Sequence, residues 1–302
     1  MKFARIKNFI KRNWLLLAIA GTLLFLVAPG CDRMEEAHGI LKSDRFVVGN
    51  GVLVGLEVGG KPRVAFVTCR HVITDRMIAT GRSFLDRAAD ENYLYFNKRG
   101  WGFWYKGFNN IDSKRWNLSP YADQDFAWIV LTEDELSSFA NGSPSYCRMP
   151  RDLFDEDSDI LKASDFRTRG FSIGSPVELM HMFSPVTGEG EPCEKFYWQT
   201  YIKVPSSAYM LANVYSESGS LIKGQSPIRV DNVDAGGHSS NVLDVMTMDI
   251  RAHVNISGSP VFTNLGGKRY LIGLQVAYSA DGSSAFQSLD RILPHIRDSL
   301  LR

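Results

Sequence analysis

The sequence predicts an all-β protein that ends in one helix, and three observations support this class. Short runs rich in valine and aromatic residues recur along the chain, which is typical of strands. The chain also contains 26 glycines and 12 prolines, many of which separate these runs as turn residues do. Apolar residues at helical spacing are scarce before residue 289. This combination favours a β-barrel or a β-sandwich.

The first two strands are predicted to form a hairpin. Residues 46–58 are rich in valine and broken by glycine, and residues 63–69 form a second β-prone run. The segment 59–62, Gly-Gly-Lys-Pro, has the composition of a tight turn between them. Further β-prone runs occur at residues 93–96, 126–131, 196–204, 270–276 and 285–289.

Two segments are predicted to be helical. Residues 132–139 favour a short helix, and residues 289–301 carry apolar side chains at the spacing of an amphipathic helix packed on a sheet. Pro294 is compatible with that second helix only in its first turn, where a backbone N–H has no helical partner.

The first 31 residues have the features of an export signal. Five basic residues and no acidic one precede an apolar stretch at residues 14–28, which is short for a membrane span of about 20 residues but fits the core of a signal peptide. Residues 28–31, Ala-Pro-Gly-Cys, resemble a bacterial lipobox in which Cys31 would carry the lipid. A cleaved lipoprotein, an uncleaved signal anchor, and a secreted protein or buried helix stay open. The basic residues predict that the remainder of the chain lies outside the cytoplasm.

The charge balance gives no sign of a nucleic-acid partner. Lysine and arginine total 34 and aspartate and glutamate 33, and no basic stripe with interleaved aromatic residues occurs. The cysteines lack the spacing of a zinc site, so no metal is expected. Export permits a Cys147–Cys193 disulfide, and the alternative is that Cys69, Cys147 and Cys193 are small buried side chains.

Three short motifs carry the residues of nucleophilic catalysis. Residues 255–262, Asn-Ile-Ser-Gly-Ser-Pro-Val-Phe, form a small-residue turn with Ser257, followed at once by an apolar β-prone run. His71 follows the strand at residues 63–69. Asp125 precedes the apolar run at residues 126–131, where a carboxylate needs a partner such as a histidine N–H. Asp123, two residues earlier, is the reserve candidate.

The motifs around His71, Asp125 and Ser257 resemble, in the same order, those of the trypsin-like serine proteases, bacterial branch, over residues 46–290. Segment 68–72 resembles Thr-Ala-x-His-[Cys/Val] of that family, and the others resemble Asp-[Ile/Leu/Phe]-Ala and Gly-x-Ser-Gly-Gly-Pro. The resemblance implies two six-stranded antiparallel β-barrels, a chymotrypsin-like double barrel with a C-terminal helix. It also implies that Ser257 is the nucleophile, His71 the general base and Asp125 the acid that orients it.

The domain boundaries expected from this resemblance follow the composition. Residues 1–31 are a signal or anchor segment and residues 32–45 a polar tether. The first barrel is expected at residues 46–150. The second barrel, with the C-terminal helix, is expected at residues 151–302.

The resemblance also assigns residues around the serine. The backbone N–H groups of Asn255 and Ser257 would form the oxyanion hole, although the family usually has glycine where Asn255 stands; asparagine tolerates positive φ better than most residues. Ile256 replaces the aspartate used in zymogen activation, so no such activation is expected. Arg251 would lie near the floor of the substrate pocket and favour acidic side chains, and the alternative is a solvated strand arginine.

The sequence therefore predicts a serine endopeptidase that acts on polypeptides in the bacterial cell envelope. It would be anchored to the inner membrane by its N-terminal segment, with the protease domain outside the cytoplasm, and would need no cofactor. One alternative is a catalytically weak or inactive trypsin-like module that serves as an envelope binding or scaffold protein. Another is an unrelated β-sandwich in which the motifs coincide by chance. No feature of the sequence predicts an oligomeric state.

Overall fold

The computed structural model describes residues 37–43, 46–75, 82–88, 92–97, 104–108, 111–137, 146–149, 173–181, 209–211, 215–230, 240–251, 256–265, 268–278 and 282–302. The chain divides into two units, Met1–Asp32 and Arg33–Arg302, and every described residue belongs to the second. None of the helices in the described ranges is long and apolar enough to cross a membrane. The export signal and the lipid on Cys31 fall outside these ranges and stay predictions.

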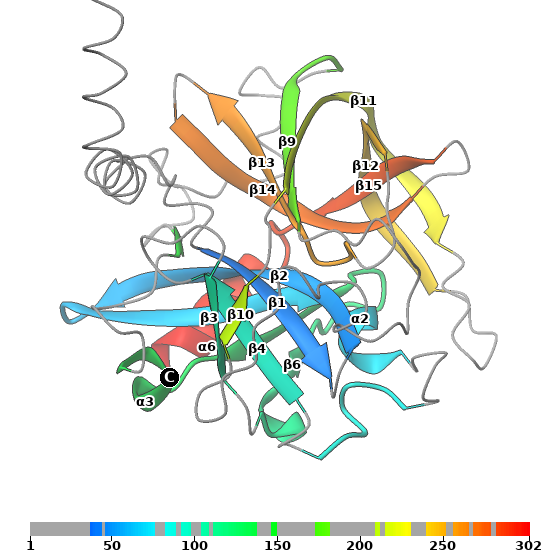
Figure 1. Ribbon diagram of the computed structural model, residues 1–302. Coiled ribbons are helices and arrows are strands. Elements are labelled where there is room, and N and C mark those ends of the chain that lie inside the picture. The colour runs from blue at the N-terminus through cyan, green and yellow to red at the C-terminus, as the bar shows by residue number, and fades with distance from the viewer. Residues whose placement is uncertain are drawn as a thin grey trace, which may run out of the picture. The chain divides into compact units, whose positions relative to one another are not determined.

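The first half of the chain supplies most of a nine-stranded sheet (Figure 1). Across the sheet its strands are β10 (Tyr209–Leu211), β5 (Trp104–Phe108), β4 (Asn92–Asn97), β1 (His38–Ser43), β2 (Phe46–Val58), β3 (Lys61–Cys69), β7 (Phe126–Val130) and β6 (Asn117–Leu118). Neighbours along this path are antiparallel, and β8 (Cys147–Arg148) adds a short parallel pair with β2. The predicted hairpin of residues 46–58 and 63–69 is confirmed as β2 and β3.

The second half of the chain forms a closed six-stranded barrel. Its strands, in order around the barrel, are β11 (Tyr215–Val230), β12 (Ser240–Arg251), β15 (Ser283–Ser288), β14 (Lys268–Tyr278), β13 (Pro260–Leu265) and β9 (Pro176–His181). All neighbours in it are antiparallel.

The prediction of two closed barrels is confirmed for the second sheet only. In the described part of the chain the first sheet is open, because the strands at its two edges, β10 and β6, do not pair with each other. One edge is β10, which comes from residues 209–211 of the second half and pairs with β5; the other is the two-residue β6. The first domain was expected to end at residue 150, but β10, at residues 209–211, belongs to the first sheet.

The polar tether expected at residues 32–45 is wrong for residues 38–43. This segment is β1, which pairs with β2 on one side and β4 on the other. Ile40 and Leu41 are fully buried, so the strand forms part of the core rather than a linker.

The predicted helices are confirmed with shorter bounds. Residues 132–139 contain α3 (Glu133–Ser137), and the C-terminal helix is α6 (Leu293–Leu301), with Pro294 in its first turn. Two further short helices are α2 (Arg70–Thr74) and η3 (Ser113–Arg115). The α6 helix packs on β2, β3 and β7, and Trp128 Nε1 donates a 3.1 Å hydrogen bond to Ser299 Oγ. The sequence placed α6 with the second barrel, but its apolar side chains cover the first sheet.

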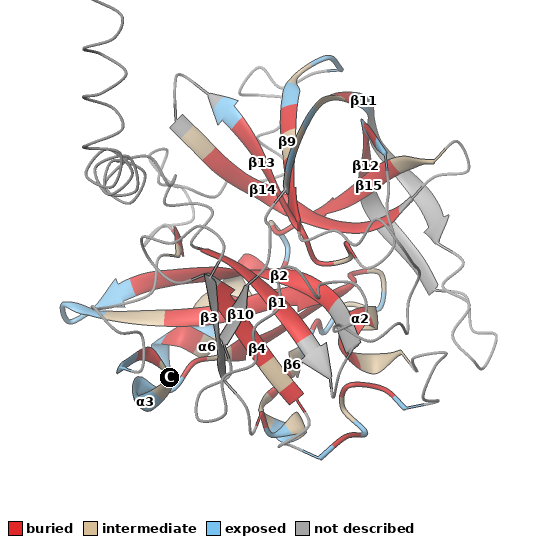
Figure 2. Cartoon of the chain, viewed as in Figure 1, coloured by how far each residue is buried: buried red, intermediate tan, exposed pale blue. Residues whose placement is uncertain are grey.

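Both faces of the barrel strand β14 are buried, which explains the continuous apolar run at residues 270–276. Successive side chains on a strand point to opposite faces. Tyr270 and Ile272 belong to the core inside the barrel, whereas Leu271 belongs to the core shared with the first sheet and α6. The pairing of β14 with β13 shifts register between Leu271 and Gly273, and beyond this shift Leu274 also belongs to the shared core. Figure 2 shows buried residues along β14 and along β2 in the other sheet. The contacts of β3 with β14 and of β2 with β13 join the two sheets, and the candidate site lies at this junction.

Candidate active site

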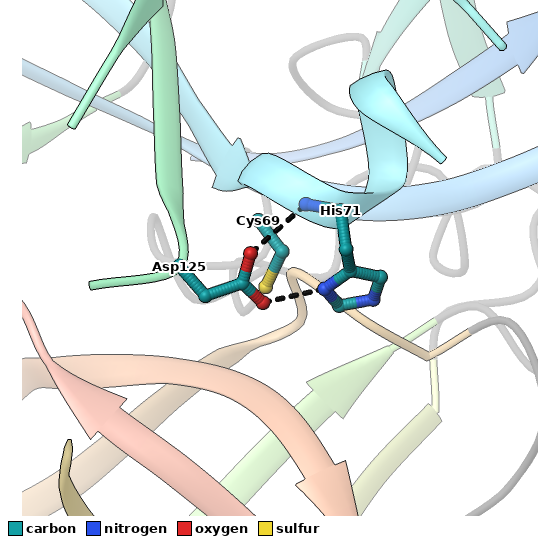
Figure 3. Close-up of side chains that lie close together, drawn as sticks. All are labelled: Cys69, His71 and Asp125. Carbon is teal, nitrogen blue, oxygen red and sulfur yellow. Dashed lines mark hydrogen bonds and ion pairs between the residues drawn. The ribbon is translucent and has the colours of Figure 1, made fainter. Parts of the chain in front are cut away.

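The ends of two paired strands place His71 beside Asp125. In the β3–β7 pair Cys69 lies opposite Phe126, so the residues just beyond these strands meet. His71 Nδ1 lies 2.5 Å from Asp125 Oδ2, and the His71 backbone N–H donates to Oδ1 at 2.9 Å (Figure 3). Because a carboxylate accepts hydrogen bonds, Nδ1 carries a proton, and in the neutral form of the imidazole Nε2 is therefore the basic nitrogen. This is the tautomer that a general base needs.

Asp125 is buried, with hydrogen bonds at each of its polar groups. Its exposed fraction is 7%. Beyond the carboxylate, its backbone carbonyl accepts from the Arg70 N–H at 3.1 Å and its own N–H donates to Gln287 Oε1 at 2.8 Å. A buried carboxylate is tolerated only with such partners. The reserve candidate, Asp123, instead places its carboxylate 2.8 Å from Arg291 Nη1.

The turn that carries Ser257 is held from both sheets. The Ser257 carbonyl accepts a 2.8 Å hydrogen bond from the Asn50 N–H on β2. On the other side, the Gly258 N–H donates to the Gln275 carbonyl on β14 at 2.8 Å. Ser259 extends this pairing, since its carbonyl accepts from the Gln275 N–H at 2.9 Å. Six backbone groups of five residues therefore fix the turn at the entrance to β13.

This turn adjoins the segment that leads into His71. The Gln275 carbonyl that accepts from Gly258 also accepts from Cys69 Sγ, at 3.2 Å. A Cβ on Gly258 would come within 2.6 Å of Thr68 Oγ1. The Ser257 carbonyl and the Val72 side chain likewise both lie against Gly49. The fold thus brings the serine turn against residues 68–72 and joins His71 to Asp125; their catalytic roles stay a proposal.

Cys69, which the sequence analysis considered only as a small buried side chain, is fully buried and is a third polar group beside His71 and Asp125. Its Sγ, a ligand atom of His71 and one of Asp125 lie within 4.8 Å of one another (Figure 3). Burial, and then the charge of Asp125, raise the pKa of the Cys69 thiol well above its ordinary value, so it stays neutral and donates. The 2.5 Å between Nδ1 and Oδ2 is a hydrogen-bond distance, shorter than the about 3.3 Å between two ligand atoms of tetrahedral zinc. The cluster is arranged for hydrogen bonding.

Comparison with known proteins gives a match at the level of structure. No protein-family model and no curated protein matches the sequence. The structure is similar to the MamO protease domain from Magnetospirillum magneticum, apo form, with 11% identity over 87% of this chain and 97% of that chain and a TM-score of 0.49. The structure matches a bacterial protease domain.

A second solved structure is Rv3671c from M. tuberculosis H37Rv, a serine-to-alanine mutant in an inactive form. The identity is 13% over 91% of this chain and 92% of that chain, with a TM-score of 0.45. Both TM-scores lie below 0.5, so any function of this chain has to be argued from its own residues.

Asn50 connects the serine turn to a buried histidine. Its N–H holds Ser257, its carbonyl accepts from Thr68 Oγ1 at 2.6 Å, and its side-chain Oδ1 lies 2.9 Å from His38 Nε2. Since an amide oxygen only accepts, His38 Nε2 carries a proton. The pKa of His38 is lowered to about 3, mainly by burial; the hydrogen bond to Asn50 opposes this lowering in part, and the electrostatic effect of His181 adds to it. His38 is therefore neutral in the folded protein near neutral pH.

The neutral His38 predicts an acid-dependent loss of stability. The pKa of His38 is lowered from 6.5 to about 3 on folding, so the unfolded chain takes up a proton that the folded chain excludes. Its contribution is complete above pH 6.5 and is lost as the pH falls toward 3, by up to about 1.4 kcal/mol per pH unit. His38→Gln keeps a donor to Asn50 but does not titrate. We expect the urea-measured unfolding free energies of the two proteins to converge or cross between pH 7 and 4; parallel curves would contradict the prediction.

Gly258 occupies a position that only glycine fits. Its φ is +84°, and a Cβ there would lie 2.0 Å from the Asn50 carbonyl oxygen. Gly258→Ala is expected to reduce the unfolding free energy by roughly 2–5 kcal/mol, from the left-handed backbone and the overlap together. Gly282 is the matched control, because it has the same φ of +84° and nothing within 4 Å. Gly282→Ala should cost only about 1–2 kcal/mol; equal losses in denaturant unfolding would refute the steric argument.

The roles of the remaining predicted site residues stay predictions. Asn255 lies outside the described ranges, so the oxyanion hole stays a prediction. Arg251 is the last residue of β12, is exposed, and lies opposite Ser283 in the sheet; its role in a substrate pocket also stays a prediction. Cys147 is buried on β8 and Cys193 lies outside the described residues, which leaves their disulfide a prediction.

Proposed function

We propose that this chain is a serine endopeptidase that uses Ser257, His71 and Asp125. The observation that carries the proposal is the double hydrogen bond from His71 to the buried Asp125 carboxylate, which fixes the imidazole with Nε2 as the base. The position of the Ser257 turn against residues 68–72 supports it further. A serine hydroxyl is a weak nucleophile at neutral pH and needs such a base to attack a peptide.

The proposed reaction proceeds through an acyl-enzyme. Ser257 Oγ attacks the carbonyl carbon of the substrate while its proton moves to His71 Nε2. Asp125 stabilises the imidazolium that forms, and the same proton then passes to the leaving amine. Water, activated by His71, hydrolyses the ester in the second half. The backbone N–H groups of Ser257 and Asn255 would stabilise the oxyanion, each worth about 2.7–4 kcal/mol in the transition state.

The proposal includes a chymotrypsin-like arrangement, with the closed barrel and the first sheet each contributing part of the site. His71 and Asp125 come from the first sheet, and Ser257 precedes the barrel strand β13. We further propose that the domain acts in the cell envelope, held at the inner membrane by residues 1–31, on polypeptide substrates and without a cofactor. The location rests on the sequence of residues 1–31, whereas the substrate class and the lack of a cofactor rest on the resemblance of the three motifs to trypsin-like serine proteases.

Arg251 is proposed to favour substrates with an acidic side chain before the cleaved bond. Its cationic side chain is exposed at the end of β12, six residues before Ser257 (257 − 251). The test compares cleavage of matched fluorogenic peptides with Glu or Leu at that position, in the wild type and in Arg251→Gln. A preference for Glu that Arg251→Gln removes supports the pocket role. Equal cleavage of both peptides contradicts it.

The proposed function is tested by hydrolysis of a labelled, unfolded protein substrate by the full chain. We expect fragments to accumulate with time, and pre-treatment with a fluorophosphonate to stop their formation. A folded chain that produces no fragments would contradict the endopeptidase proposal. It would favour instead the alternative of a trypsin-like module that binds polypeptides without cleaving them.

A further inference from the structure

The segment that carries Asp125 is hydrogen-bonded at two points by one side chain from the other half of the chain. Gln287, on β15 of the closed barrel, is fully buried. Its Oε1 accepts from the Asp125 N–H at 2.8 Å, and its Nε2 donates to the Asp123 carbonyl at 2.9 Å. The single amide thus bridges a donor and an acceptor two residues apart.

The two partners fix the orientation of this amide. Rotating it by half a turn would set its NH₂ against the Asp125 N–H and its oxygen against the Asp123 carbonyl, which are two repulsive pairs. Only glutamine has the length and the donor–acceptor pair seen here, apart from a protonated glutamic acid. Arg291, four residues after Gln287, also holds this segment: it pairs with the Asp123 carboxylate and lies over the Tyr121 ring.

We infer that Gln287 is a positioning residue for the acid, and that through it the barrel holds the Asp125 carboxylate in place for His71. The inference rests on the proposed function. The hydrogen bonds from Arg70 and His71 to Asp125 come from helix α2, next to the first sheet, whereas the bond between Asp125 and Gln287 crosses from the barrel. Without Gln287 the buried Asp125 N–H lacks its acceptor and the segment moves to find another.

The kinetic test compares Gln287→Met, Gln287→Glu and Thr263→Val. Gln287→Met keeps the volume and removes both hydrogen bonds; a displacement of the acid by about 1 Å should lower kcat/KM by about 10²-fold. Gln287→Glu restores both bonds only when its carboxyl group is protonated. Its kcat/KM relative to wild type should therefore rise as the pH falls, while the ratio for Gln287→Met stays constant. Thr263→Val removes a hydrogen bond from another buried barrel residue, to the Pro176 carbonyl at 2.8 Å, and should leave kcat/KM within about threefold.

A readout that needs no hydrolysis separates this inference from the proposed function. The proton between His71 Nδ1 and Asp125 Oδ2 should give a far-downfield proton resonance that Asp125→Asn removes. We expect Gln287→Met to shift or broaden this resonance and Thr263→Val to leave it unchanged. An unchanged resonance in folded Gln287→Met overturns the positioning role, whether or not the wild type cleaves peptides. If Gln287→Met shifts the resonance but the wild type shows no peptidase activity, the positioning role is kept and the proposed function is rejected.

Discussion

Ser257→Ala is expected to lower kcat for peptide hydrolysis by about 10⁶-fold, the loss that follows removal of a serine nucleophile. The reason is that the oxygen that attacks the substrate is gone, and the remaining groups can assist only a direct attack by water on the peptide bond. KM should change little, because the hydroxyl contributes to the reaction rather than to binding. The measurement is steady-state hydrolysis of a fluorogenic peptide by the full chain.

Ser284→Ala is the matched control for this variant. Ser284 is fully buried on β15, and its Oγ has no hydrogen-bond partner among the described residues. Removing a buried hydroxyl without a partner is neutral or stabilising. We expect its kcat to stay near that of the wild type. Retention of activity in Ser257→Ala, or an equal loss in both variants, would reject Ser257 as the nucleophile.

Asp125→Asn is expected to lower kcat by about 10⁴-fold. The amide of asparagine can donate to His71 Nδ1, which forces the proton onto Nε2 and leaves the imidazole unable to accept the serine proton. The backbone bonds of Asp125 to Gln287 and Arg70 do not depend on the carboxylate, so the fold should persist. The measurement is kcat together with the unfolding free energy of the same preparation.

Asp123→Asn distinguishes the two carboxylates that the sequence left as candidates. Asp123 pairs with Arg291, and both side chains are partly exposed, so this ion pair is worth about 0–1 kcal/mol. We expect kcat to fall by less than about tenfold, because a change of this size in free energy corresponds to at most such a factor. A greater loss in Asp123→Asn than in Asp125→Asn would reverse the assignment.

Local patterns were sufficient to predict the hairpin of β2 and β3, the terminal helix and the neighbourhood of the site. The glycine-broken valine run and the Gly-Gly turn determine the hairpin through strand and turn preferences. His71 and Asp125 were predictable because each adjoins an apolar strand end, and neighbouring strand ends meet. The order of the three motifs along the chain was the reason to assign Ser257 to the same site as His71 and Asp125.

Long-range pairing was not predictable from the sequence. The sequence predicts a tether at β1 because polar residues flank its short apolar centre, whereas the burial of this strand depends on pairing with β2 and β4 on either side. The β10 strand joins β5 from about a hundred residues away in the chain, which no local pattern encodes. With these two strands the first sheet has nine strands, whereas a closed barrel of six strands was expected.

The residues that support the site were the least visible in the sequence. Gln287 is one of two polar residues, with Ser288, in the β-prone run at residues 285–289, and it forms a hydrogen bond with Asp125, 162 positions away in the chain. Asn50 had a weak signal, since it stands between two glycines in a strand where a buried amide needs partners. A polar side chain inside an apolar strand was the available clue in both cases.

The most direct measurement is the site at which a fluorophosphonate attaches to the folded full chain. Peptide mapping by mass spectrometry after brief treatment should find one phosphonylated residue, Ser257, and should find none when the chain is denatured beforehand. An adduct on a different serine, or no adduct on Ser257 in a chain that remains folded, would contradict activation of Ser257 by the His71–Asp125 pair.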